Sequence, residues 1–150
     1  MEFRRSYDID VPPDLLWPVV MDVHEVAACL EGVDELTVID DDTYRGTLSV
    51  KMGPARFRFA GDVVVTERDS EAWKGVLQAT ASDSKSGGGF RASMTMQLDE
   101  RGAGSTLELT LETSFLGRIG QLGRPLIRKK ITKMMDRFAQ SLSERLEQRV

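Results

Sequence analysis

Side chains able to do acid–base or metal chemistry are few in this sequence and do not cluster. His24 is the only histidine and Cys29 the only cysteine, which excludes a histidine-based metal cluster and a cysteine pair with ligand spacing. We expect His24, near a predicted helix start, to be solvated or capping, and Cys29, in an apolar run, to be a small core residue. The acidic run 40–42 is typical of a hairpin turn rather than of a buried acid pair. The sequence therefore predicts no metal site, no cofactor and no catalytic residues.

The glycine run 87–89 raises the question of phosphate binding, because glycine-rich loops can cradle phosphate. Such loops lead into a helix N-terminus, whereas this run joins two predicted strands, so we expect a tight turn. Nucleic-acid binding is not expected either, because the chain carries a net charge of −4 and its aromatic residues fall on the apolar face of the predicted strands.

Positive charge is concentrated near the C-terminus of this acidic chain. Residues 118–137 include seven basic residues and a single acid, Asp136, which gives a net charge of +6. Such asymmetry favours a face directed at an anionic partner, either a membrane surface or an acidic protein, although the solvated side of any long helix also carries charge. The predicted contacts with this partner are Arg118, Arg124, Arg128, Lys129, Lys130 and Lys133.

Hydrophobic periodicity predicts the order of the elements. Residues 1–10 alternate with a period of two and predict a strand, and residues 14–30 predict two short helices broken near Asp22. From Gly117 onward, apolar residues at three-and-four spacing predict one long amphipathic helix. Turn-forming residues separate six further strands, which we place at 35–39, 43–52, 56–67, 72–81, 90–98 and 106–113.

This order predicts an α+β protein with a helix-grip fold. A chain of 150 residues fits one domain, which we expect to span residues 1–150. A curved seven-stranded antiparallel sheet exposes one apolar face, and only the C-terminal helix is long enough to cover it. The two short helices follow the first strand.

Small residues are frequent at the inward-facing positions of the predicted sheet. Glycine or alanine stands at positions 46, 61, 75, 79, 81 and 92, among much larger apolar residues. A curved sheet under one helix is hard to fill at these positions, so we predict an internal apolar cavity; glycines that mark strand bends are the alternative. The predicted ligand-binding residues are Tyr44, Val50, Met52, Phe57, Phe59, Trp73, Phe90, Met94 and Met96 of the sheet, and Ile119, Leu122, Leu126, Met134 and Phe138 of the helix.

Several motifs, taken in this order of elements, resemble a known family. They are ACLEG at 28–32, VKMGP at 50–54 with FAG at 59–61, GGGF at 87–90 and GRIGQLG at 117–123. Over nearly its whole length the chain is similar to the family of the carbon monoxide dehydrogenase G subunit, which belongs to the START-like, polyketide cyclase/dehydrase (SRPBCC) superfamily. Glu31 stands where the family usually has proline, so we expect the local turn to differ.

The resemblance implies a helix-grip domain with an apolar cavity and no known catalytic residues. Members accompany molybdenum hydroxylases of the carbon monoxide dehydrogenase type and are thought to recruit the enzyme to the membrane or to link it to the quinone pool. In such a role Leu116, Ile119, Leu122 and Leu126 would contact lipid while the neighbouring basic residues meet anionic head groups.

The sequence also predicts where the protein is located. No apolar run approaches the roughly 18 residues that span a bilayer, and the N-terminus does not resemble a secretion signal. Some family members continue into a linker and a membrane anchor, whereas this sequence ends at Val150. We therefore expect a cytoplasmic protein, with any membrane contact peripheral and at the inner face.

Three functional hypotheses follow. The first is a non-catalytic protein that binds a lipophilic molecule, such as a quinone or an isoprenoid, and serves a molybdenum hydroxylase at the membrane. The second is a small cyclase or hydrolase of the same superfamily, in which Arg5, Tyr7 or Tyr44 supplies the polar group of the cavity because these residues share the inward phase of their strands. The third is an assembly factor whose basic helix docks on a partner protein.

Overall fold

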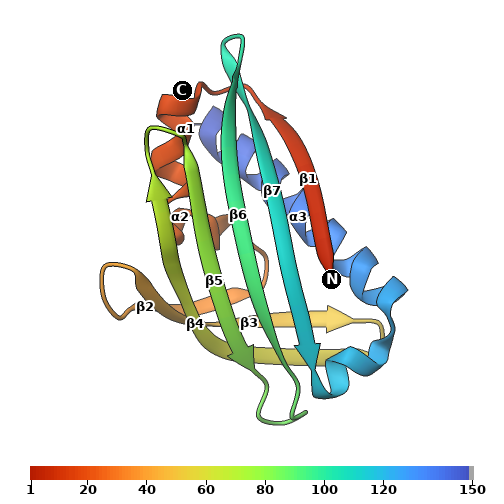
Figure 1. Ribbon diagram of the computed structural model, residues 1–150. Helices are drawn as coiled ribbons and strands as arrows, with labels where there is room; N and C mark the ends of the chain where they lie inside the picture. The colour runs from red at the N-terminus through yellow and green to blue at the C-terminus, as the bar shows by residue number, and fades with distance from the viewer. Residues whose placement is uncertain (149–150) are drawn as a thin grey trace.

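The computed structural model describes residues 1–148 and shows a helix gripped by a curved sheet (Figure 1). The strands form one antiparallel sheet in the order β1-β7-β6-β5-β4-β3-β2, and α3 lies against its concave face. The α+β helix-grip prediction, with seven strands and two short helices after the first, is confirmed. The elements are β1 (Glu2–Ile9), α1 (Pro13–Val20), α2 (Val23–Cys29), β2 (Val33–Val38), β3 (Thr43–Met52), β4 (Ala55–Asp69), β5 (Lys74–Ser82), β6 (Gly89–Arg101), β7 (Gly104–Leu116), the 3-10 helix η1 (Gly117–Leu122) and α3 (Arg124–Glu147).

The prediction of one continuous helix from Gly117 is wrong. Gly123 has a φ angle of +89°, which a regular right-handed helix does not allow, so η1 and α3 are separate. Gly117, at the start of η1, has a φ angle of +70°. Gly117 also lies so close to the Gly87 carbonyl that an added Cβ would be 2.6 Å from that oxygen. The apolar spacing continues across Gly123, and for this reason periodicity does not reveal the break.

Local turn chemistry follows the predictions with one exception. The Asp40 side chain accepts a hydrogen bond from the Asp42 amide within the β2–β3 turn, and residues 87–88 lie in the β5–β6 loop. Asp22, rather than His24, caps α2, since its carboxylate accepts the amides of His24 and Glu25. The exception is the strand predicted from residue 72, which begins at Lys74 because Trp73 occupies a turn with a φ of +51°.

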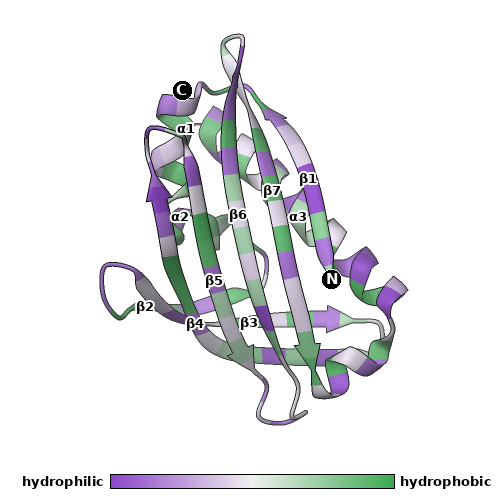
Figure 2. Ribbon diagram, viewed as in Figure 1, coloured by the Kyte–Doolittle hydropathy of each residue, from purple (hydrophilic) through white to green (hydrophobic). Residues whose placement is uncertain are grey.

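The half of the interior next to α1 is tightly packed. Apolar and polar residues alternate along the strands (Figure 2), and α1 packs on β6 and β7. Leu16 of α1, Leu98 of β6, Leu107 of β7 and Leu142 of α3 are all at most 1% exposed. Gly75 also faces inward, but Met21 fills its space: a Cβ at Gly75 would be 2.4 Å from the Met21 sulfur.

Polar clamps hold α3 on both of its flanks. On the β1 side, Asp136 accepts hydrogen bonds from the Arg5 guanidinium at 3.0 Å and from the Tyr7 hydroxyl at 2.6 Å. On the α2 side, Arg137 pairs with Glu31 at 3.1 Å, and a second ion pair joins α3 to α2 further along. The position of α3 over the sheet is therefore set by directional contacts as well as by apolar packing.

Candidate functional site

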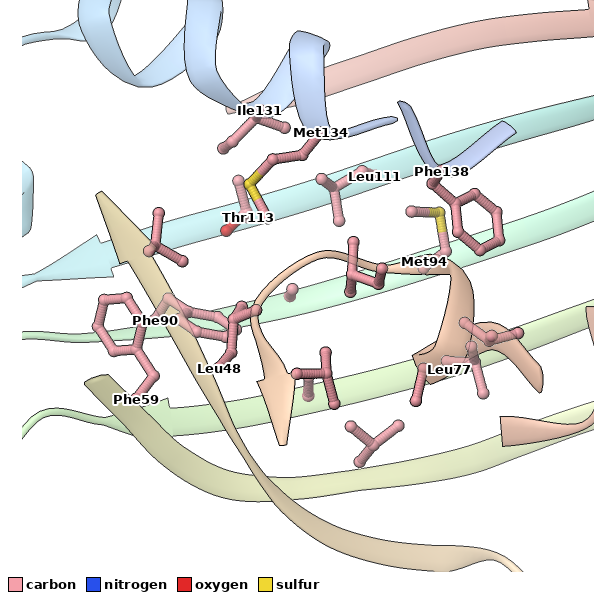
Figure 3. A pocket seen from close by; sticks show the side chains of 18 of the residues that line it. Leu48, Phe59, Leu77, Phe90, Met94, Leu111, Thr113, Ile131, Met134 and Phe138 are labelled. Atoms are coloured by element: carbon pink, nitrogen blue, oxygen red, sulfur yellow. The ribbon is translucent and has the colours of Figure 1, made fainter. Parts of the chain in front are cut away.

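A cavity of about 320 Å³ lies between α3 and the sheet, in the half of the interior that α1 does not fill. The sheet supplies its floor from β3 to β7, α2 and β2 close one side, and α3 covers it. Figure 3 shows Ile131, Met134 and Phe138 directed from α3 towards Leu111 and Met94 of the sheet. This volume lies at the lower end of the range for small-molecule sites, about 300 to 1,000 Å³.

The cavity wall is almost entirely apolar. No charged side chain lines it among the described residues, and its only polar side chains are Thr47 and Thr113. The Thr113 hydroxyl donates to the Arg91 carbonyl at 3.0 Å, and the Thr47 hydroxyl bonds to Asp34. Both hydroxyl protons are thus already engaged, and the cavity suits hydrocarbon better than a polar group.

Nine of the predicted ligand-binding residues line this cavity. They come from three strands, from η1 and from α3, and so from segments far apart in the sequence. Their role in binding a ligand remains a prediction. The nine are Val50, Met52, Phe59, Phe90, Met94, Met96, Ile119, Met134 and Phe138.

Five predicted residues lie outside the cavity. Trp73 is displaced by its turn conformation, and Phe57 stacks on Phe59 from outside the cavity, with ring centroids 5.4 Å apart. Tyr44 makes an edge-on contact with the His24 ring at 5.9 Å instead. Leu122 is in η1 and packs at the margin of the core, and Leu126 lies beside Gly53 of the β3–β4 turn.

The sequence reasoning missed the side wall formed by α2 and β2. Its residues include Val26, Leu30 and Leu36, and the apolar spacing of α2 was a usable signal. Thr113 was also missed, although it continues the inward phase of Leu109 and Leu111 along β7. Leu36 had no such signal, because a register shift between Asp34 and Thr37 breaks the alternation of β2.

Arg5 and Tyr7 are not cavity groups, contrary to the second hypothesis. Both bind Asp136 on the β1 side of α3, and Arg5 is solvent-exposed. Burial, together with the hydrogen bond to Asp136, raises the pKa of Tyr7 to about 12. The Tyr7 hydrogen bond and the Arg5 guanidinium lower the pKa of Asp136. This arrangement keeps Tyr7 neutral and Asp136 charged, as expected of a structural clamp.

The predicted basic contact residues are on the surface, and most are well exposed. Arg118, Arg124, Arg128, Lys129, Lys130 and Lys133 make no ion pair with any residue in the described part of the chain. Arg128 lies over the Phe3 ring at 4.8 Å. Of the expected lipid contacts, Leu116 is 61% exposed, but Ile119 is 1% exposed and faces the cavity, so it cannot contact lipid in this conformation.

Comparison with known proteins agrees with this architecture. The family model of the carbon monoxide dehydrogenase G subunit (CoxG) matches residues 6–147. The chain belongs to the CoxG family. No curated protein matches the sequence.

Several solved structures share the fold of this CoxG family member. A conserved protein from Geobacillus kaustophilus superposes with a TM-score of 0.89 at 15% identity, over 99% of this chain and 96% of that one. A START superfamily protein from Mycobacterium smegmatis gives 0.72 at 11% identity, over 99% of each chain. The Zhui aromatase/cyclase from Streptomyces sp. R1128 gives 0.68 at 13% identity, over 99% and 94%. At these identities the likeness shows the fold alone.

The family match, the shared fold and the cavity together support a ligand-binding protein. The described helices include none that is long and apolar enough to cross a membrane. Among the described residues, no group of three or more metal-ligating side chains is close enough together to hold an ion.

Proposed function

We propose that this CoxG family member is a non-catalytic binding protein whose cavity holds a lipophilic molecule of the quinone or isoprenoid type. The observation that carries the proposal is the cavity itself, about 320 Å³ in volume and lined by apolar side chains. We further propose that the protein serves a molybdenum hydroxylase, by recruiting it to the membrane or linking it to quinone. The name of the family supports this partner, and the basic residues of α3 that form no ion pair with any described residue support a peripheral membrane contact.

The energetic cost of an empty cavity supports occupation by a ligand. Residual voids in protein cores cost about 24 cal/mol per Å³. The unfilled apolar volume of this cavity therefore lowers the stability of the ligand-free protein. Water would relieve little of this loss, because the wall offers few polar partners. A hydrocarbon chain would restore the missing dispersion contacts.

The chemistry of the wall also indicates how a quinone would bind. A quinone head presents carbonyl oxygens, which need hydrogen-bond donors, and the hydroxyl protons of Thr47 and Thr113 are engaged elsewhere. An isoprenoid tail needs only apolar contacts. The tail therefore occupies the cavity, and the head remains near its margin.

Solvent extraction tests the proposal with a matched pair of variants. Ala79 lines the cavity, and the next residue, Thr80, is exposed on the other face of the same strand. Ala79→Leu and Thr80→Leu, purified from the same host as the wild type, are extracted with organic solvent and the extracts analysed by mass spectrometry. We expect a stoichiometric lipophile in the wild type and in Thr80→Leu. In Ala79→Leu we expect at least about a tenfold loss of bound lipophile, because the leucine side chain fills part of the cavity and weakens binding by more than about 1.4 kcal/mol.

Equal amounts of lipophile in both variants would place it outside the cavity. If none co-purifies, menaquinone is added to the purified proteins and followed by fluorescence quenching of the tryptophans. Failure of the wild type to bind would contradict the proposal.

An assembly role is the second candidate, favoured by the basic residues of α3 that no described acid pairs with. Under that hypothesis Ala79→Leu leaves maturation of the hydroxylase unchanged, whereas charge reversal on α3 impairs it.

A further inference from the structure

The tertiary structure places basic residues from three distant segments around one surface groove. Lys51 and Arg56 come from the β3–β4 hairpin, Lys85 from the β5–β6 loop and Arg118 from η1. These segments lie close together at the end of the molecule where β7 leads into η1 (Figure 1). The groove has a volume of about 670 Å³, and hydroxyl-bearing side chains, Ser49 and Ser84 among them, complete its wall.

The positive charge of the groove is not neutralised within the described part of the protein. Lys51, Arg56, Lys85 and Arg118 form no ion pair with any described residue. The remaining cation, Arg58, pairs with Asp34 and Glu35.

Asp83, the one acid among the described residues of the groove wall, is already engaged. Asp83 is buried, and its carboxylate accepts the backbone amides of Arg58, Lys85 and Ser86, which hold the loop in place. It is therefore a structural anchor for the loop rather than a counter-ion for the four free cations. Cations gathered in a concave surface concentrate the positive potential and favour a multivalent anion.

An exposed apolar side chain lies beside the groove. Leu116 is 61% exposed, pairs with Gly89 in the sheet and precedes Gly117, which touches the β5–β6 loop. Arg124, Arg128 and Lys129 are further exposed cations in the first turns of α3, the helix that follows η1. Exposed leucine among unpaired cations is the combination that peripheral membrane proteins use, since the leucine enters the interface while the cations meet phosphates.

We propose that this groove binds the phosphate head group of an anionic phospholipid and so sets the orientation of the protein on the membrane. The inference rests on the proposed peripheral membrane contact and gives it a site, in which the β3–β4 hairpin and the β5–β6 loop act together with η1. The cavity and the head-group site are then neighbours, since Val50 borders both spaces and Phe57 of the groove stacks on Phe59 of the cavity.

Vesicle co-sedimentation tests the site with two variants of equal charge change. The groove variant is Lys51→Glu/Arg56→Glu/Lys85→Glu. The control variant is Arg4→Glu/Lys74→Glu/Arg91→Glu, which alters exposed or half-exposed cations of other surfaces. On vesicles of phosphatidylglycerol mixed with phosphatidylcholine we expect at least about a tenfold loss for the groove variant, because each basic residue near an anionic surface contributes about 1 kcal/mol. The control variant should lose less than about threefold.

Two further measurements distinguish binding of free phosphate from binding of a lipid head group. Leu116→Ser should lower vesicle binding without changing the affinity for inorganic pyrophosphate, measured by calorimetry. Equal losses in the two charge variants would overturn the site, since net charge alone would then explain binding. Pyrophosphate binding without any vesicle binding would overturn the lipid assignment. The lipophile retained in the groove variant is measured in parallel, and its retention separates failure of this site from failure of the cavity.

Discussion

The two halves of the space between sheet and helix contrast sharply, although the same alternation of residues builds both. Near α1, Leu16, Leu98 and Leu107 are fully buried in the packed core. Further along the same sheet, Ala79 and Ala92 face a cavity. The contrast shows that α1 fills one end of the space inside the curved sheet, and that the end without such a helix stays hollow. Function is then expected at the hollow end and stability at the packed end.

The largest expected effect compares two leucines of β7 that face the same side, four residues apart. Leu107 is 0% exposed in the packed half, whereas Leu111 is partly exposed towards the cavity. Leu107→Ala should lower the free energy of unfolding by about 3 to 4 kcal/mol, and Leu111→Ala by about 1 to 2 kcal/mol, because its removal only enlarges an existing space. Urea denaturation of the delipidated protein measures both. Equal losses would mean that the two halves are packed alike.

Replacing a small residue by leucine should have opposite effects on stability in the two halves. Ala92 faces the cavity, while Ala139 of α3 is buried outside it. Ala139→Leu should destabilise the protein by about 1 to 3 kcal/mol through overpacking. Ala92→Leu should stabilise the ligand-free protein by about 1 kcal/mol by filling part of the void. Urea denaturation measures both variants. Destabilisation by Ala92→Leu would show that the cavity has no room for a larger side chain.

The clamp of α3 to β1 should appear in the pH dependence of stability. The pKa of Tyr7 is raised from 10.0 to about 12, so its contribution is fully present below about pH 10 and is lost as pH rises towards 12. The pKa of Asp136 is lowered, so its contribution is present above the ordinary range for aspartate and is lost in acid.

Tyr7→Phe should therefore cost about 1 kcal/mol at neutral pH and remove the additional loss above pH 10. Urea midpoints across this range measure the difference from wild type. Tyr44→Phe changes the only other tyrosine and should leave the alkaline slope unchanged. An identical slope in all three proteins would refute the assignment.

The smallest effect is expected at the seam between α2 and α3, beside the cavity. Glu31 and Arg137 are exposed and pair at 3.1 Å, next to Leu30 and Phe138 of the cavity wall. Glu31→Gln/Arg137→Gln should change stability by less than about 0.5 kcal/mol but speed ligand release by about two- to threefold. Stopped-flow fluorescence of a bound lipophile measures the rate. The control is Arg101→Gln, which breaks an ion pair with Asp8 away from the cavity. If ligand release is accelerated equally in this control, the seam between α2 and α3 is not the release path.

Local patterns in the chain were enough to predict the order of the elements, the inward phase of most strands and the small residues that leave room for a cavity. These features follow from alternation and helical spacing, which are properties of neighbouring residues. Boundaries moved by a few residues, as at Lys74, where the preceding turn residue takes a positive φ. The break at Gly123 could not be predicted, since a glycine does not reveal its φ angle when the apolar spacing continues beyond it.

Which inward positions are hollow, and which polar groups are accessible, depends on the tertiary structure alone. Gly75 looks like Gly46 in sequence, yet Met21 fills the space at the first, whereas the second lines the cavity. Arg5 shares the inward phase of β1, but its guanidinium binds Asp136 on the flank of α3. The cations of the groove meet although they are far apart along the chain. Each of these outcomes depends on how a curved sheet brings distant segments together, and neither composition nor periodicity contains that information.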